Sequence, residues 1–256
     1  MEQSIEAYVK SSVNGSITTI EFFHPQSNSL PGILLQSLAD TITAAGKEKE
    51  CHVIVLKSSG TKAFCAGASF DELIQIKNKE EGLRFFSGFE KVINAMRTCP
   101  KLIIARIQGK CVGGGVGLAA AADYAIALDT ADIKLSELAV GIGPFVVGPA
   151  VERRMGLSAF SSLAIDATTW RSANWAEQHG LFSEIHTSIH QLDEAVNKLA
   201  QTLAASSPEA MSELKSIFWK GTENWEALLR ERAAISGRLI LSEFSRNAIE
   251  KFKSKQ

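Results

Sequence analysis

A cluster of four glycines within five positions restricts the fold of this chain more than any other sequence feature. The cluster lies in GKCVGGGVGLAAAADYAIA and consists of Gly113, Gly114, Gly115 and Gly117. An apolar, strand-like run (residues 101–109) precedes it, and another (124–129) follows after a short alanine-rich segment. Glycine is the costliest residue to order, so such a cluster needs a structural reason. It can form a phosphate-binding turn, an anion hole at a helix N-terminus, or a close contact between two backbones.

The rest of the chain alternates between strand and helix patterns and then becomes helical. We expect strands at residues 16–23, 52–60, 101–109, 124–129 and 133–136, and helices at 34–45 and 71–98. Further helices are expected at 149–155, 159–166, 173–179, 192–204, 210–220 and 225–243. This order predicts an α/β core followed by a helical C-terminal region.

The composition is that of an ordinary globular protein. The chain has 256 residues, of which 45% are hydrophobic and 21% charged, with a formal net charge of −1. This charge predicts neither a nucleic acid nor a membrane as partner, and the apolar runs are too short to span a bilayer. The four cysteines form no CxxC pair and the N-terminus is polar, so we expect reduced thiols, no signal peptide and a cytoplasmic protein. The five histidines are isolated, which argues against a metal site.

Two segments, residues 53–73 and 102–121, repeat one order of features. Each contains an apolar strand, a glycine, a short polar link, a cluster of small residues and the start of a helix. The N–H groups in the first turn of a helix have no acceptor within the helix. Each segment is therefore predicted to present backbone donors from a turn of small residues.

The glycine cluster also fits a dinucleotide-binding pattern. Residues 115–120 match G-x-G-x-x-A, and Glu137 lies 22 residues (137 − 115) after Gly115, near the place of a ribose-binding acid. A parallel crossover takes about a dozen residues or more, however, and the next strand begins too soon for one. An anion hole fits better, because the helix dipole favours negative charge and glycine leaves room for a substrate oxygen. Close packing stays open for any single glycine.

The two segments resemble those of the crotonase superfamily, the enoyl-CoA hydratase/isomerase group. AFCAGASFDEL resembles the first oxyanion segment of this family, and GKCVGGGVGLAAAADYAIA resembles the second. IKLSELAVGIGP resembles the active-site loop, LAIDATTWRSANWAEQHGLFSEI the region leading out of the core, and SSPEAMSELKSIF a C-terminal helix start. The resemblance implies an α/β fold with a spiral of ββα units over residues 1–195 and a helical trimerisation region over residues 196–256.

In this family two backbone N–H groups bind the thioester oxygen of an acyl-CoA. By motif position, the resemblance assigns these donors to Ala68 and Gly114. Enolate formation places negative charge on that oxygen, and one preorganised donor is worth about 3–4 kcal/mol. The resemblance also implies substrate contacts from Ala66, Gly67, Phe70, Gly113, Gly117, Leu138 and Gly141. It implies coenzyme A as part of the substrate, no separate cofactor, no metal, and self-association as a homotrimer or hexamer.

The sequence departs from the family pattern at two positions. Ser69 stands where an aspartate usually follows the first donor, and we expect this change to alter a loop contact rather than the chemistry. Gly117 stands where hydratases with two carboxylates carry the first glutamate. The second glutamate is Glu137, and its apolar neighbours, including Leu138 and Val140, predict a pKa raised by desolvation.

A single carboxylate favours isomerisation over hydration. Hydration needs a held and activated water together with a proton donor, which paired carboxylates supply. Moving a double bond needs one base that removes a proton from C2 and returns it at C4. We therefore predict an enoyl-CoA isomerase with Glu137 as its acid and base. The alternatives are a hydratase with one glutamate, other enolate chemistry such as decarboxylation, a non-catalytic acyl-CoA-binding subunit and a nicotinamide-dependent dehydrogenase.

Overall fold

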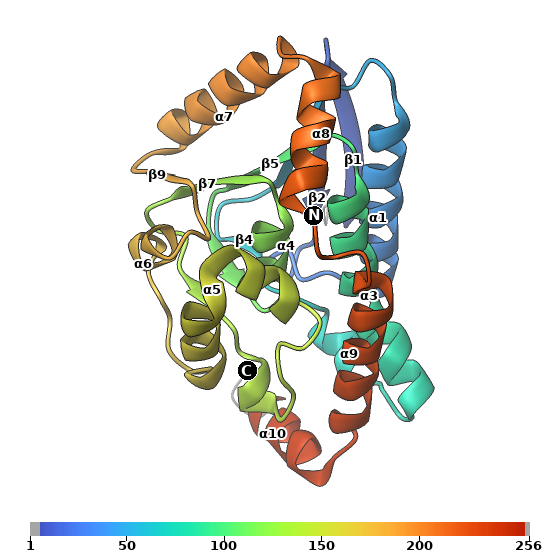
Figure 1. The fold of residues 1–256 in the computed structure, drawn as a ribbon. Coiled ribbons are helices and arrows are strands. Elements are labelled where there is room, and N and C mark those ends of the chain that lie inside the picture. Colours follow the sequence, from blue (N-terminus) through green and yellow to red (C-terminus); the bar gives the residue numbers. More distant parts are fainter. Residues whose placement is uncertain (1–5, 254–256) are drawn as a thin grey trace.

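Two β-sheets form the centre of the computed structural model, which describes residues 6–253 (Figure 1). The larger sheet has the order β1-β2-β3-β5-β7-β9, with β1 antiparallel to β2 and the other neighbours parallel. Its strands are β1 (Tyr8–Asn14), β2 (Ile17–Phe23), β3 (Val53–Ser58), β5 (Leu102–Ile107), β7 (Tyr124–Leu128) and β9 (Glu184–His186). The smaller, parallel sheet contains β4 (Ala63–Cys65), β6 (Lys110–Val112) and β8 (Ile133–Lys134).

The chain enters both sheets in turn and so forms a spiral. β3, β5 and β7 lie in the larger sheet, and each is followed directly by a strand of the smaller sheet, β4, β6 or β8. The first two of these units are the predicted repeats, and they stack in parallel through both sheets. The spacing of the repeats thus places the small-residue turns that follow β4 and β6 next to each other.

The helices pack around this spiral. They are α1 (Gly32–Lys47), α2 (Phe70–Leu73), α3 (Lys79–Thr98), α4 (Gly114–Ala121), α5 (Gly148–Ile165), α6 (Ala173–Gln178), α7 (Ile189–Ala204), α8 (Pro208–Phe218), α9 (Trp225–Leu239) and α10 (Glu243–Lys253). A 3₁₀ turn, η1 (Glu137–Val140), follows β8. α9 runs beside α3, and α10 packs against η1 (Figure 1).

Apolar residues on both faces of the larger sheet are buried. The main core lies between the sheets and helices α1, α3, α4 and α5. On the other face, α7 packs Leu192, Val196 and Ala200 against strand residues such as Val55 and Ile126. The boundary expected between the spiral region (1–195) and the helical region (196–256) falls inside α7. Residues 1–5 of the first region and 254–256 of the second lie outside the described residues.

Two of the predicted helices were wrong in extent. The helix expected over residues 71–98 is two helices, because α2 ends at Leu73 and Asn78 caps α3 by accepting a hydrogen bond from Glu81 N at 2.9 Å. The helix expected over 225–243 ends at Leu239, and Ser242 Oγ accepts from Ser245 N at 3.2 Å as α10 begins. Both breaks depend on capping side chains.

The short strands β4, β6 and β9 and the polar edge strand β1 did not give a strand pattern in the sequence. β4, β6 and β9 have three residues each, too few to show an alternation, and β1 pairs only with β2. The expectation for the cysteines is confirmed, because all four are buried and free. Within residues 6–253, no helix is both long and apolar enough to cross a membrane.

Candidate active site

The segment after β4 carries the first predicted oxyanion donor, the N–H of Ala68. Leu30 forms a parallel bridge with this segment: Leu30 N donates to Gly67 O at 2.8 Å, and Ser69 N donates to Leu30 O at 3.2 Å. In such a bridge the N–H of the middle residue points away from the partner strand. The Ala68 N–H therefore has no acceptor among the described residues, and Ala68 lines a cavity.

The turn before α4 carries the second predicted donor, the N–H of Gly114. Gly113 caps this helix with φ 53° and ψ −112°, a conformation that L side chains rarely adopt, and its N–H donates to Lys134 O at 2.9 Å. Gly114 begins the helix, so its N–H has no intrahelical acceptor, and no other described residue supplies one. A Cβ at Gly114 would lie 2.1 Å from Phe89 Cζ, so the ring leaves no room for a side chain.

The two donor segments touch. A Cβ added to Gly67 would lie 3.0 Å from Val112 O and 3.5 Å from Gly114 N. Gly67 has φ +91°, in the region that favours glycine. Both predicted donors thus border one cavity, as an oxyanion hole requires.

Loop contacts hold the first donor segment in place. Ser27 and Asn28 have φ values of 53° and 56°, and Ser27 O accepts from Ala66 N at 3.2 Å. Asn28 Nδ2 donates to the carbonyl oxygens of Ser59 and Ala63 at 2.8 and 2.9 Å. These hydrogen bonds stabilise a turn that would otherwise be strained.

Ser69, the first departure from the family pattern, is the N-cap of α2. Its Oγ accepts from Glu72 N at 3.3 Å. Serine and aspartate are both favoured N-cap residues, so the change keeps this local contact. The acidic side chains of Asp71 and Glu72 lie in the first turn of the same helix, where the helix dipole favours them.

Glu137 begins η1 and places its carboxyl group beside the glycine turn. A Cβ at Gly113 would lie 2.9 Å from Glu137 Oε1, so even one methyl group would collide with the carboxyl. Oε2 is buried and has no hydrogen-bond partner among the described residues. Burial raises the pKa of Glu137 to about 7, and a hydrogen bond from its own backbone N–H offsets only part of this rise.

Gly117, the second departure, faces a valine. A Cβ at Gly117 would lie 2.5 Å from Val147 Cγ1 and 2.7 Å from Val147 Cβ. Both residues are buried, and Val147 also lines the cavity. The space that a side chain at position 117 would need is therefore occupied by Val147.

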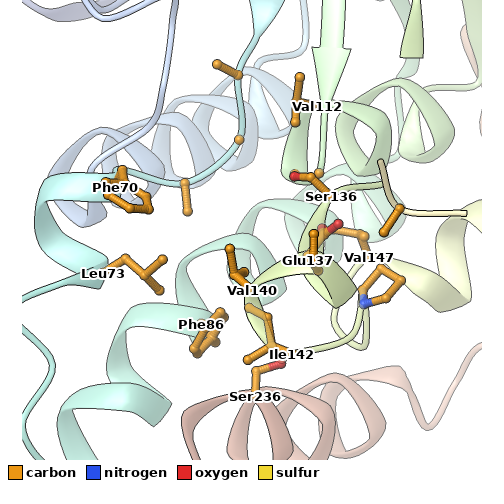
Figure 2. A pocket seen from close by; sticks show the side chains of 18 of the residues that line it. Phe70, Leu73, Phe86, Val112, Ser136, Glu137, Val140, Ile142, Val147 and Ser236 are labelled. Carbon is orange, nitrogen blue, oxygen red and sulfur yellow. The ribbon is translucent and has the colours of Figure 1, made fainter. Parts of the chain in front are cut away.

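A cavity of about 1050 Å³ joins these groups (Figure 2). Figure 2 shows Glu137 near Val147 and Ser136, with Phe86 and Ile142 toward the end remote from Val112. Much of the wall is apolar, formed by Phe70, Leu73, Phe85, Phe86, Phe89, Val140, Ile142, Phe145 and Val147 among others. A cavity of this size and lining suits a small organic ligand with an apolar part.

Most of the predicted site residues line the cavity. Those that line it are Ala66, Gly67, Ala68, Phe70, Gly113, Gly114 and Glu137. Gly117 lies behind Val147, Leu138 is 49% exposed, and Gly141 packs against Phe244 and Ser245 of α10. These three residues do not line the cavity.

The wall also contains residues from distant elements whose mutual placement cannot be derived from the sequence. Val147 lies at the start of α5, Ser236 on α9, and Asn247 on α10, yet all three line the cavity. No spacing relates these positions to the glycine segments, and only the chain's folding brings them together. Among the described residues, no group of three or more His, Cys, Asp or Glu side chains could hold a metal ion.

The fold and the paired glycine turns define a crotonase-type α/β protein. An enoyl-CoA hydratase from Bacillus halodurans has a crystal structure that superimposes with a TM-score of 0.88 at 22% identity, over 95% of this chain and 99% of that one. The family model described as enoyl-CoA hydratase/isomerase matches residues 12–255. The chain belongs to this family, and the predicted superfamily and fold are confirmed.

Two curated relatives show the range of similarity. Human mitochondrial methylglutaconyl-CoA hydratase is 30% identical over 200 residues, which cover 77% of this chain and 58% of that protein. A probable enoyl-CoA hydratase from Bacillus subtilis is 25% identical over 245 residues, which cover 95% of each. Membership of the family makes the chain an acyl-CoA enzyme of the hydratase/isomerase kind.

Proposed function

We propose that this protein is an enoyl-CoA isomerase in which Glu137 is the only acid and base. One observation carries the proposal: Val147 fills the space beside Gly117, where the second carboxylate of a hydratase would lie. Of the described residues that line the cavity, Asp71 is the other carboxylate, and it is exposed and accepts from Gln26 Nε2 at 2.8 Å. This leaves Glu137 as the buried carboxyl group available for proton transfer.

The proposed reaction moves one double bond of a 3-enoyl-CoA. The Glu137 carboxylate removes a proton from C2, and the electron pair forms a dienolate whose charge lies on the thioester oxygen. The N–H groups of Ala68 and Gly114 would donate to that oxygen, and a donor of this kind is worth about 3–4 kcal/mol. The protonated carboxyl then returns its proton at C4, which gives the 2-enoyl-CoA. Coenzyme A takes part only as the thioester group of the substrate.

The pKa of about 7 suits a group that must take up and release the same proton. Near neutral pH both the ionised form, which removes the proton, and the protonated form, which returns it, are accessible to Glu137. Hydration would also require a polar group to hold the attacking water. The methyl groups of Val147 cannot hold it, and this argues for isomerisation although the two relatives above are named as hydratases.

The direct test supplies the purified protein with 3-enoyl-CoA and with 2-enoyl-CoA in separate assays. We expect conversion of the 3-enoyl to the 2-enoyl thioester and only slow addition of water to the 2-enoyl thioester. Glu137→Gln should lower isomerisation by a factor of about 10² to 10⁴ and leave acyl-CoA binding in place. Rapid hydration of 2-enoyl-CoA, or full isomerase activity in Glu137→Gln, would overturn the proposal.

We also propose that the C-terminal helical region mediates self-association. α8 exposes Leu214, Ile217 and Phe218, and their spacing places them on one side of the helix. An exposed apolar stripe of this kind is typical of an interface. Ile217→Lys should lower the mass measured by light scattering, whereas Ser216→Lys, on the same helix and also exposed, should leave it unchanged. An unchanged mass for Ile217→Lys would contradict this proposal.

A further inference from the structure

Ser236 is a buried polar residue in the wall of the cavity. It lies on α9, is 1% exposed and lines the cavity together with Phe86, Val140 and Ile142. Figure 2 shows it at the end remote from Val112, next to Ile142. The proposed oxyanion donors and Glu137 belong to other segments, so Ser236 has no place in the proton transfer described above.

The hydroxyl of Ser236 has no hydrogen-bond partner within residues 6–253. A serine inside a helix commonly bonds to a carbonyl oxygen one turn earlier, and Ser236 does not. Because Ser236 lines the cavity, the hydrogen-bonding capacity of its hydroxyl is open to a molecule in the cavity.

Helix packing explains the small size of residue 236 but not its hydroxyl group. The neighbouring Gly237 meets Gly82 of α3 so closely that a Cβ on Gly82 would lie 2.6 Å from Gly237 Cα. Alanine would also be small, forms helices better than serine and buries no polar atom. The hydroxyl group is therefore available to form a hydrogen bond with a molecule in the cavity.

The surroundings of Ser236 indicate what it would bind. Ile240, the C-cap of the same helix, belongs to an apolar cluster with Ile142, Phe86 and Val140. A substrate chain that reaches this end of the cavity thus meets these apolar side chains and the neutral hydroxyl of Ser236. Ser236 itself matches a neutral oxygen group, because its hydroxyl carries no charge to pair with a carboxylate.

We propose that Ser236 selects acyl-CoA substrates whose acyl chain carries a neutral oxygen group, a hydroxyl or a ketone, near the end remote from the thioester. This proposal rests on the proposed function in one respect: the proposed oxyanion donors decide at which end of the cavity the thioester binds. The serine hydroxyl can donate to a ketone and can both donate to and accept from an alcohol. A site of this kind discriminates against a chain that lacks the oxygen, because its own polar group then stays unpaired.

The test measures binding of saturated acyl-CoAs, which have no double bond to isomerise. A series of increasing chain length, each member with and without a terminal hydroxyl, is titrated calorimetrically into the wild-type protein, Ser236→Ala and Ser87→Ala. Ser87 is the control, because its hydroxyl is buried and has no hydrogen-bond partner among the described residues, and it does not line the cavity. Circular dichroism verifies that both variants are folded.

At one chain length the wild type should bind the hydroxylated thioester about five- to tenfold more tightly than the unsubstituted one. Ser236→Ala should lose this preference and Ser87→Ala should keep it. A wild-type protein that shows no preference at any length, or a preference that survives in Ser236→Ala, would overturn the inference. Tighter binding of the corresponding terminal carboxylates would overturn it too. If the preference is found but 3-enoyl-CoA is not isomerised, the proposed function fails and the role of Ser236 stands.

Discussion

Replacing Glu137 with glutamine should make the protein more stable as well as inactive. The carboxyl group is held where its ionised form is poorly solvated, and burial raises its pKa from an ordinary 4.5 to about 7. In the unfolded chain the same group titrates near its ordinary value. The folded state therefore binds a proton that the unfolded state has already lost between pH 4.5 and pH 7.

The sign of the effect follows from this difference. Below pH 4.5 the group is protonated in both states and does not affect folding. As the pH rises from 4.5 to 7, the unfolded state loses a proton that the folded state keeps, so stability falls until the folded state ionises as well. The pKa difference of about 2.5 units, at about 1.36 kcal/mol per unit, amounts to about 3 kcal/mol above pH 7. Glutamine never ionises and is free of this cost.

Urea unfolding of the wild type and Glu137→Gln at several pH values between 4.5 and 8 measures the effect. The difference in unfolding free energy should grow across this range by about 3 kcal/mol in favour of the variant. Glu21→Gln is the control. Burial alone would raise the pKa of Glu21, but hydrogen bonds from Lys10, Lys57 and Tyr8 lower it to about 2. The stabilisation that ionised Glu21 contributes is therefore lost only as the pH falls below 4.5. The difference in unfolding free energy between the wild type and Glu21→Gln should be constant between pH 5 and 8.

A constant difference for Glu137→Gln across the same range would refute the reasoning. It would mean that the carboxyl group is better solvated or better paired than its buried Oε2 indicates. The activity profile gives an independent reading of the same group. If Glu137 is the base, kcat/KM should fall as the pH drops below about 7, because the free enzyme then loses its carboxylate.

Two further perturbations test how the site and the fold are packed. Gly117→Ala should cost about 1–3 kcal/mol in urea unfolding, because its methyl group collides with Val147. Val147→Gly, which removes the valine Cβ as well as its methyl groups, should relieve this cost in a double-mutant cycle, and additive effects would contradict the contact. Lys215→Met should cost about 3–5 kcal/mol, because it removes the buried ion-pair partner of Asp123 at 2.8 Å. Lys10→Met, which removes an exposed lysine while Lys57 still pairs with Glu21, should cost less than about 1 kcal/mol, and an equally small loss for Lys215→Met would contradict the assignment.

The local part of the site could be predicted from the sequence. The order of strand, glycine and small residues in the sequence predicted where both donor turns lie, because each turn is formed by residues that are neighbours in the chain. The raised pKa of Glu137 was also predicted, but for an incomplete reason. Leu138, one of the neighbours expected to desolvate the carboxyl group, is exposed. The burial comes instead from segments distant in the chain, among them the turn at Gly113.

The remote walls of the cavity could not be predicted in the same way. Ser236 lies 99 residues (236 − 137) after Glu137, and it reaches the cavity because α9 packs against α3 at the contact of Gly82 with Gly237. Val147 likewise meets Gly117 only through the packing of α5 on α4. Neither contact leaves a periodic signal, since each depends on the angle and distance between two helices.

The contact between Gly117 and Val147 also shows why the missing carboxylate cannot be restored by one substitution. A glutamate at position 117 needs the volume that Val147 occupies, and a Cβ alone would already lie 2.5 Å from its methyl group. Removing Val147 alone would leave an apolar gap with no group to hold a water molecule. The two positions thus depend on each other. A glutamate at position 117 requires a small residue at position 147, whereas a valine at position 147 requires a glycine at position 117. Hydration should consequently rise in Gly117→Glu combined with Val147→Gly and in neither single variant, so a gain in Gly117→Glu alone would show that Val147 does not block the second carboxylate.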